Sequence, residues 1–183
     1  MAVKVIGTGS ALPEKIVTND DLAMIMDTSD EWIKERTGIS KRRLSTGETV
    51  ADLATAACER ALEKAGKTAE EVELLIVATC TPEQLLPCVA CQVQDRIAAK
   101  NAVAFDLNAA CSGFVFALNT AQAFISSGIY KNALILGAET LSRIMDWNDR
   151  GTCVLFGDGA GAAVIKADKE GVMAFEQYSD GAK

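Results

Sequence analysis

Short apolar runs alternate with longer amphipathic stretches along most of the chain. Runs of this length, bounded by polar or glycine-containing segments, are typical of buried strands. Because strands and helices alternate, the pattern predicts an α/β fold with a largely parallel sheet and helices on both of its faces. We expect strands at Val3–Gly9, Val72–Cys80, Val103–Leu107, Ala133–Ala138 and Ala162–Lys166.

Helix-start signals precede the amphipathic stretches. The segment Thr28–Glu31 has a capping-box pattern with two acids in the first turn, which predicts a helix through Trp32–Arg36. A weaker cap signal at Thr49 begins an amphipathic helix that Gly66 ends. Proline is favoured in the first turn of a helix, so we expect another helix over Pro87–Ala99.

A further helix, Ser112–Ser127, is apolar almost all round, so we expect it to be buried on every side. The glycine-rich segment Gly157–Gly161 precedes the last predicted strand, and we interpret it as a tight turn. A dinucleotide-binding fingerprint requires a third glycine where Ala162 stands and a helix after it. The turn is therefore favoured over a nucleotide site.

Composition limits the class of protein. With 183 residues, of which 49% are hydrophobic, the chain is long enough for one sizeable core, and we expect a single domain over 1–183. A formal net charge of −7 argues against nucleic acid as a partner. No apolar stretch reaches the length of a membrane helix, and the N-terminus has the pattern of a strand rather than a signal peptide. We expect a cytoplasmic protein with no membrane partner.

Six cysteines and no histidine mark the chemistry of this chain. Most of the cysteines lie in apolar stretches, as buried reduced thiols do. Cys111 differs because it lies where the strand ending at Leu107 gives way to the helix Ser112–Ser127. A helix N-terminus favours the thiolate, which predicts a catalytic nucleophile, and the alternative is an unreactive buried thiol. Without a histidine partner, Cys111 would form half of an active site.

A second cysteine motif gives a competing hypothesis. Cys88 and Cys91 form a C-x-x-C pair at the start of a predicted helix that follows a strand. This is the setting of a thioredoxin-like redox pair, so a thiol–disulfide oxidoreductase is an alternative function. The two residues between the cysteines, Val89 and Ala90, favour the simpler interpretation of small apolar residues on a helix face.

Four separated segments carry a resemblance to a known family: Thr28–Ile39, Asn108–Phe114, Asp149–Thr152 and Phe156–Ala162. In this order they resemble β-ketoacyl-acyl-carrier-protein synthase III, the initiating condensing enzyme of bacterial type II fatty-acid synthesis. The resemblance covers nearly the whole chain but only about the N-terminal half of the family's enzyme. It implies a thiolase-like fold, in which residues 1–183 form one αβα half of the five-layer αβαβα architecture.

The resemblance also implies an activity. Cys111 matches the family nucleophile, which takes an acyl group from acyl-CoA, usually acetyl-CoA, and releases CoA. The acyl-enzyme then condenses with malonyl-acyl-carrier protein as carbon dioxide leaves. The histidine and asparagine of the family site belong to the C-terminal half, so we expect this chain alone to be inactive in condensation. Neither a permanently bound cofactor nor a metal is implied, because acyl-CoA is a substrate.

Four other positions match the family's CoA site. The resemblance implies that Trp32 and Arg150 sandwich the adenine of CoA, that Thr28 contacts this ring, and that Arg36 meets the phosphates. Indole and guanidinium groups are flat surfaces suited to stacking a base, and arginine binds phosphate through a fork of donors. The alternative is that Trp32 is an ordinary core residue and Arg150 a solvated loop charge.

The resemblance further implies association. Family members form homodimers through the strand that corresponds to Val103–Leu107, and the loop with Leu86 approaches the acyl pocket of the partner. We therefore expect a homodimer or a complex with a C-terminal half. A non-catalytic acyl-CoA-binding half-domain is a third functional alternative.

Overall fold

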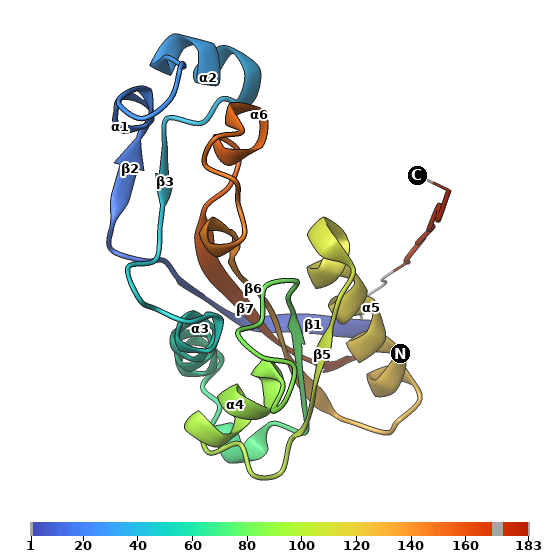
Figure 1. The fold of residues 1–183 in the computed structure, drawn as a ribbon. Helices are drawn as coiled ribbons and strands as arrows, with labels where there is room; N and C mark the ends of the chain where they lie inside the picture. Colours follow the sequence, from blue (N-terminus) through green and yellow to red (C-terminus); the bar gives the residue numbers. More distant parts are fainter. Residues whose placement is uncertain (1, 170–173, 183) are drawn as a thin grey trace.

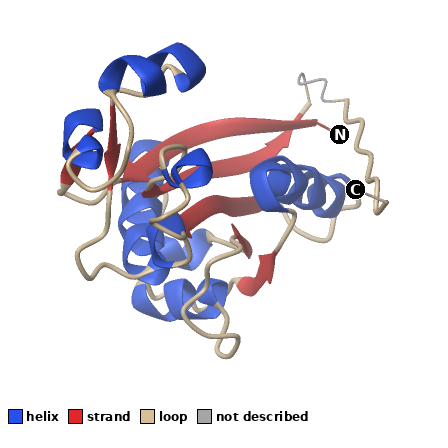
Figure 2. Ribbon diagram, turned by 45° about the horizontal axis from the view of Figure 1, so that its top comes forward, coloured by secondary structure: helices blue, strands red, loops and turns tan. Residues whose placement is uncertain are grey.

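The computed structural model describes residues 2–169 and 174–182. Within them the central sheet has five strands in the order β1-β7-β6-β4-β5 (Figure 1). Two helices cover one face of this sheet and a third covers the other (Figures 1 and 2). The strands are β1 (Ala2–Ala11), β4 (Leu74–Ala78), β5 (Val103–Leu107), β6 (Asn132–Thr140) and β7 (Asp158–Asp168). The helices on the first face are α3 (Val50–Ala65) and α4 (Val89–Arg96), and the helix on the second is α5 (Gly113–Ser126).

Strand directions differ from the prediction. β4 is parallel to β5 and to β6, but β7 is antiparallel to both β6 and β1. The expected largely parallel sheet is therefore wrong for half of the strand pairs. β6 returns into β7 without a helix that crosses the sheet, so the chain reverses direction there. In the parallel part, Ala78 pairs with Leu107 and with Gly137, so three carboxyl ends meet at one edge.

β4 separates two apolar cores. All five of its residues are buried, as the continuous apolar run predicts. Leu75 and Val77 belong to the cluster that includes α3 and α4, whereas Leu74 and Ile76 belong to the cluster that includes α5. This alternation follows from the two-residue period of a strand.

The helix α3 begins and ends where the sequence predicts. Thr49 forms a capping box with Asp52, and Gly66 takes a left-handed conformation at the C-cap, with φ of 61°. The helix backbone lies directly on β1, because a Cβ atom on Gly9 would be only 2.2 Å from the carbonyl oxygen of Ala57. Glycine in β1 is what permits this close approach.

The helix α5 matches its predicted extent but not its predicted burial. Its fully buried residues lie four apart, at Gly113, Ala117, Ala121 and Ile125. They form a single stripe against the sheet, and the side chain of Val115 outside this stripe is 50% exposed. The expectation of burial on every side is therefore wrong for this chain, because only one face of α5 packs on the sheet.

The glycine-rich segment is part of a strand. β7 begins at Asp158, and Gly159 pairs with Glu139 of β6, so the predicted tight turn is wrong. A Cβ atom on Gly159 would be 2.8 Å from Cδ2 of Leu12, next to the end of β1. Glycine at this position therefore leaves room for the Leu12 side chain, and it does not turn the backbone.

Five short elements form a separate small unit beside the sheet, the cap cluster (Figure 1). Arg42 is buried in it and donates hydrogen bonds to Oδ1 of Asn19 at 2.8 Å and to the carbonyl of Val154 at 3.0 Å. The bond to Val154 joins segments over a hundred residues apart, and of the five elements only the helix after Ser29 was predicted. The cap cluster consists of β2 (Ile16–Thr18), α1 (Asn19–Ala23), α2 (Asp30–Thr37), β3 (Lys41–Arg43) and α6 (Arg150–Cys153).

Candidate functional site

Cys111 lies in a strained turn between β5 and α5. It is the middle residue of a 3-10 turn, Ala110–Ser112, and its side chain is exposed. Ala110 has φ of 46°, a left-handed conformation that costs a non-glycine residue about 1–2 kcal/mol. A Cβ atom on Gly113 would be 3.0 Å from the Cβ atom of Ala78, so glycine lets α5 begin against the end of β4. Strain of this kind gathers at functional sites.

A cavity of about 320 Å³ opens beside Cys111. Its walls come from the carboxyl ends of the parallel strands, the start of α5 and the start of β7. In parallel α/β sheets this edge is where ligands bind. The lining residues are Ala78, Cys80, Ala110, Cys111, Phe114, Gly137, Ala138, Glu139, Leu141, Phe156 and Gly159.

Two polar residues in this cavity were not predicted from the sequence. Cys80 follows β4, and Glu139 lies near the end of β6. The Oε1 atom of Glu139 accepts hydrogen bonds from the backbone N–H of Cys80 at 2.8 Å and from its thiol at 3.2 Å. Their place after or near the ends of predicted strands is the sequence feature that could have identified them. Residues at the carboxyl ends of neighbouring parallel strands meet at one sheet edge.

Three of the other thiols have environments that disfavour ionisation. Burial raises the pKa of Cys58 on α3 and of Cys153 in α6. Loss of solvation, followed by the hydrogen bond and the charge of Glu139, raises the pKa of Cys80 to about 11. Thiols held in the neutral form are poor nucleophiles at neutral pH, so these three cysteines are not candidates for that role.

A second group of predicted residues gathers in the cap cluster. Trp32 on α2 is half-buried, and its helix begins at the N-cap Ser29. The guanidinium carbon of Arg36 lies 4.4 Å from the centroid of the Trp32 ring, and that of Arg150 lies 5.0 Å from it. The structure thus brings the three residues together in cation–π contact. Arg150 also donates to the carbonyl of Asp27 and approaches its carboxylate.

Thr28 lies beside this group, two residues before α2. Its hydroxyl oxygen is buried and has no hydrogen-bond partner among the described residues. A buried hydroxyl without a partner loses its bonds to water and gains none in return. Such an atom fits a position where a bound ligand supplies the partner.

A continuous segment connects the two groups. α6 begins at Arg150, which stacks on Trp32, and six residues later Phe156 lines the Cys111 cavity. One short stretch of chain therefore joins the arginine–tryptophan group to the wall of the cysteine cavity. The arrangement suits an extended ligand that has a planar aromatic group at one end and an electrophilic group at the other.

Comparisons with known proteins show which family the chain resembles. A family model described as 3-oxoacyl-[acyl-carrier-protein] synthase III matches residues 105–181. A β-ketoacyl-[acyl-carrier-protein] synthase III of Clostridium acetobutylicum is 58% identical over 181 residues, which are 98% of this chain and 56% of that protein. The chain is similar to β-ketoacyl-acyl-carrier-protein synthase III. The resemblance indicated by the four sequence motifs is confirmed, and the chain spans about half the length of the curated relatives it matches.

Solved structures show the fold. The crystal structure of 3-oxoacyl-[acyl-carrier-protein] synthase III from Aquifex aeolicus superposes with a TM-score of 0.90 at 52% identity, over 92% of this chain and 55% of that one. A priming β-ketosynthase of the R1128 polyketide pathway superposes with a TM-score of 0.88 at 38% identity, over 91% of this chain and 50% of that one. The predicted thiolase-like αβα half is therefore confirmed.

Leu86 and the C-x-x-C pair lie away from the cavity lining. Leu86 is 85% exposed, and its predicted role across a dimer interface stays a prediction. Cys88 is the N-cap of α4, where Asp106 accepts hydrogen bonds from the next two backbone N–H groups. A hydrogen bond with Cys88 raises the pKa of Cys91. The oxidoreductase alternative therefore stays a hypothesis.

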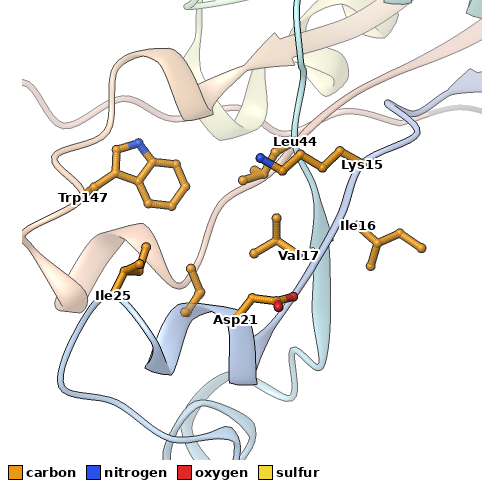
Figure 3. A pocket seen from close by; sticks show the side chains of 8 residues that line it. Lys15, Ile16, Val17, Asp21, Ile25, Leu44 and Trp147 are labelled. Carbon is orange, nitrogen blue, oxygen red and sulfur yellow. The ribbon is translucent and has the colours of Figure 1, made fainter.

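The cap cluster contains a larger hollow of about 450 Å³ (Figure 3). Figure 3 shows apolar side chains around it, with the Trp147 ring on one side and Lys15 and Asp21 among its polar members. None of its lining residues is a cysteine, and it shares no residue with the Cys111 cavity. It is lined by Lys15, Ile16, Val17, Asp21, Leu22, Ile25, Leu44 and Trp147.

Two further kinds of feature are absent from the described residues, 2–169 and 174–182. In them no group of histidine, cysteine or carboxylate side chains has the arrangement of a metal site. No helix in that part of the chain combines the length and apolar character needed to cross a membrane.

Proposed function

We propose that this chain carries the acyl-accepting site of a β-ketoacyl-acyl-carrier-protein synthase III, with Cys111 as the nucleophile. The observation that supports this most directly is the exposed cysteine at a strained turn, in a cavity that the segment from Arg150 to Phe156 joins to the stack on Trp32. The relatives named above are β-ketoacyl synthases by name, and acyl-CoA is the substrate class that the resemblance implies.

In the proposed acyl transfer, the sulfur of Cys111 attacks the carbonyl carbon of the acyl-CoA thioester and gives up its proton to water. The carbonyl π electrons move to oxygen, and the backbone N–H of Cys111 stabilises the resulting oxyanion. Collapse of this intermediate breaks the bond to the CoA sulfur, which leaves as a thiolate. Leu141 and Phe156 give the cavity apolar walls for a short acyl chain.

CoA binding requires a movement of Arg150. Its guanidinium already stacks on Trp32 at 5.0 Å, which leaves no room for a base between them. The ion pair of Arg150 with Asp27 is solvent-exposed, and exposed pairs contribute only about 0–1 kcal/mol. We propose that an adenine displaces Arg150 from Trp32 and then stacks between the two, with Arg36 toward the phosphates and the Thr28 hydroxyl bonded to the base.

Condensation with malonyl-acyl-carrier protein needs further groups. Loss of carbon dioxide builds negative charge on the malonyl thioester, and the 183 residues contain no imidazole to stabilise it. We therefore propose that these residues perform the acylation step, and that the condensation step uses the histidine and asparagine of the other half of the family's enzyme.

Acylation can be tested directly on the chain. After incubation with acetyl-CoA and removal of free CoA, intact mass should increase by one acetyl group, and peptide mapping should place it on Cys111. Cys111→Ala should abolish the adduct. Trp32→Ala should slow its formation by about tenfold or more at low acetyl-CoA, because a base-stacking contact contributes about 1–3 kcal/mol.

Arg96→Ala is the matched control, because Arg96 on α4 forms an exposed ion pair with Asp52 and lies outside both groups. Its acylation rate should equal that of the unmodified chain. CoA binding without any adduct on Cys111 would instead support the non-catalytic binding module, and an adduct that persists in Cys111→Ala would reject the assigned nucleophile.

A further inference from the structure

Two cysteines share the cavity described above. Cys80 follows β4 and Cys111 follows β5, and these strands are parallel neighbours whose ends, Ala78 and Leu107, pair with each other. Gly113, two residues after Cys111, packs against Ala78, two residues before Cys80. Adjacent strands lie about 4.8 Å apart, and disulfides join Cα atoms about 4.4–6.8 Å apart. Because Cys80 and Cys111 follow these neighbouring strand ends and line one cavity, both thiols lie at the same site.

Glu139 holds the Cys80 thiol in place. Its Oε1 atom accepts from both the backbone N–H and the thiol of Cys80, and its Oε2 atom accepts from the hydroxyls of Thr79, at 3.2 Å, and Thr81. Thr81 is buried and its hydroxyl also accepts from the backbone N–H of Thr140 at 2.9 Å. The carboxylate is therefore fixed on both oxygens, and with it the position of the Cys80 sulfur.

We propose that Cys80 is a resolving thiol for Cys111, so that oxidation by hydrogen peroxide joins the two in a reversible intramolecular disulfide. The bond would protect Cys111 from irreversible oxidation and would block its acylation while it lasts. The effect on acylation rests on the proposed function, but formation of the disulfide does not.

The chemistry takes place in two steps. The Cys111 sulfur attacks one peroxide oxygen, the O–O bond breaks, and Cys111 becomes a sulfenic acid while the other oxygen leaves as water. The Cys80 sulfur then attacks the Cys111 sulfur, the S–O bond breaks, and a second water leaves as the S–S bond forms. Two thiols lose two electrons in total, and one peroxide gains them. The Cys80 proton passes to the Glu139 carboxylate that already accepts it, and then to the departing hydroxide.

The environment of Cys80 fits the resolving role. Partial desolvation and the neighbouring Glu139 raise its pKa to about 11, and the Cys111 sulfur contributes a smaller electrostatic effect in the same direction. At neutral pH Cys80 therefore stays a thiol and reacts slowly with peroxide itself. Its proton is removed only when Cys111 offers an electrophilic sulfur beside it.

Peptide mapping after mild peroxide treatment tests the proposal. The reduced chain is exposed to limiting hydrogen peroxide, remaining thiols are alkylated, and the digest is analysed without reductant. We expect a cross-linked peptide that contains Cys80 and Cys111, and its loss on treatment with dithiothreitol. The acylation assay is not needed, so failure of this result is distinguishable from failure of the proposed function.

Two variants sharpen the test. Cys80→Ser keeps a hydrogen-bond donor for Glu139, and in this variant Cys111 should proceed to sulfinic acid. Cys88→Ser changes a thiol outside the cavity and should leave the cross-linked peptide unchanged. Sulfinic acid on Cys111 in the unmodified chain without a cross-link would overturn the proposal, as would disulfides between chains or between Cys111 and any other cysteine. The presence or absence of the cross-linked peptide in the unmodified chain tests the proposal even if a variant fails to fold.

Discussion

The two faces of the central sheet differ in how completely they are covered. On the α3 face the helix backbone lies directly on the glycines of β1, and eight residues of α3 are buried. On the α5 face only one stripe of the helix is buried, and apolar residues outside it, Phe114 and Val115, are exposed. Cys111 lies at the start of α5, on the open face. We propose that the covered face supplies stability, and that the open face supplies the reactive group and a surface for association.

The largest expected effect comes from disturbing the closed face. A side chain on Gly9 would collide with the α3 backbone at 2.2 Å from the carbonyl oxygen of Ala57 and 2.5 Å from the amide nitrogen of Ala61. Because backbone cannot give way as a side chain can, Gly9→Val should lower the free energy of unfolding by about 3 kcal/mol or more. Urea denaturation followed by circular dichroism measures this.

Gly161→Ala is the control for that prediction. Gly161 lies in β7 next to the partner of Gly9, but a Cβ atom there has no neighbour within 4 Å. Its free energy of unfolding should change by less than about 1 kcal/mol. Equal losses in the two variants would show that close packing of α3 on β1 is not the cause.

The second prediction compares one cysteine from each face. Cys58 on α3 is fully buried and burial raises its pKa, whereas Cys111 is exposed. Under limiting iodoacetamide near pH 7, Cys111 should be alkylated about a hundredfold faster than Cys58, because only an accessible thiolate reacts. Quantitative peptide mass spectrometry gives both rates.

Cys153 provides an internal control for this labelling, because it is also buried and its pKa is also raised. It should react as slowly as Cys58. Uniform labelling of all three thiols would indicate an unfolded chain or an unreactive Cys111, and the nucleophile assignment would lose its physical basis.

The third prediction concerns association through the open side. β5 is an edge strand of the sheet, with Val103 50% exposed, and α5 exposes Val115 to the same extent. Exposed apolar faces and unpaired strand edges favour association, so the chain should be at least dimeric at micromolar concentration. Light scattering after size exclusion measures the mass. Val115→Glu or Val103→Glu should weaken the dimer by about tenfold, the first if the helix face is the contact and the second if the strand edge is.

Met24→Glu is the control for association, because Met24 is exposed at the end of α1 in the cap cluster. It should leave the mass unchanged. A well-folded monomer of the unmodified chain would contradict association through either surface, and with it the homodimer that the resemblance implies.

Local signals in the sequence predicted the elements that depend on neighbouring residues. The bounds of β5 are as expected, α5 differs by one residue at each end, and α3 begins after the Thr49 cap and ends at Gly66. The helix predicted over 87–99 is shorter, at Val89–Arg96, and the first strand is longer than Val3–Gly9. Capping, turn chemistry and hydrophobic periodicity act over a few residues, so a single sequence contains them.

Cys111 and its place before a helix were also evident from the sequence, and the family motifs indicated Trp32 and Arg150. The structure adds that Arg150 already stacks on Trp32, so the proposed adenine binding requires Arg150 to move. It also adds Glu139 and Cys80, which the sequence analysis did not connect with Cys111. Their proximity depends on strand order.

The tertiary structure alone decided the direction of β7, the use of Gly159 in a strand and the one-sided burial of α5. Each of these depends on which distant segments become neighbours: Gly159 faces Leu12 from the other end of the chain, and Arg42 reaches Val154. Apolar periodicity shows which face of a helix or strand is apolar, but it does not show which segment will pack against that face. The sequence by itself thus indicated most strands and helices of the central sheet and singled out Cys111, whereas contacts between distant residues determined the cavity around it.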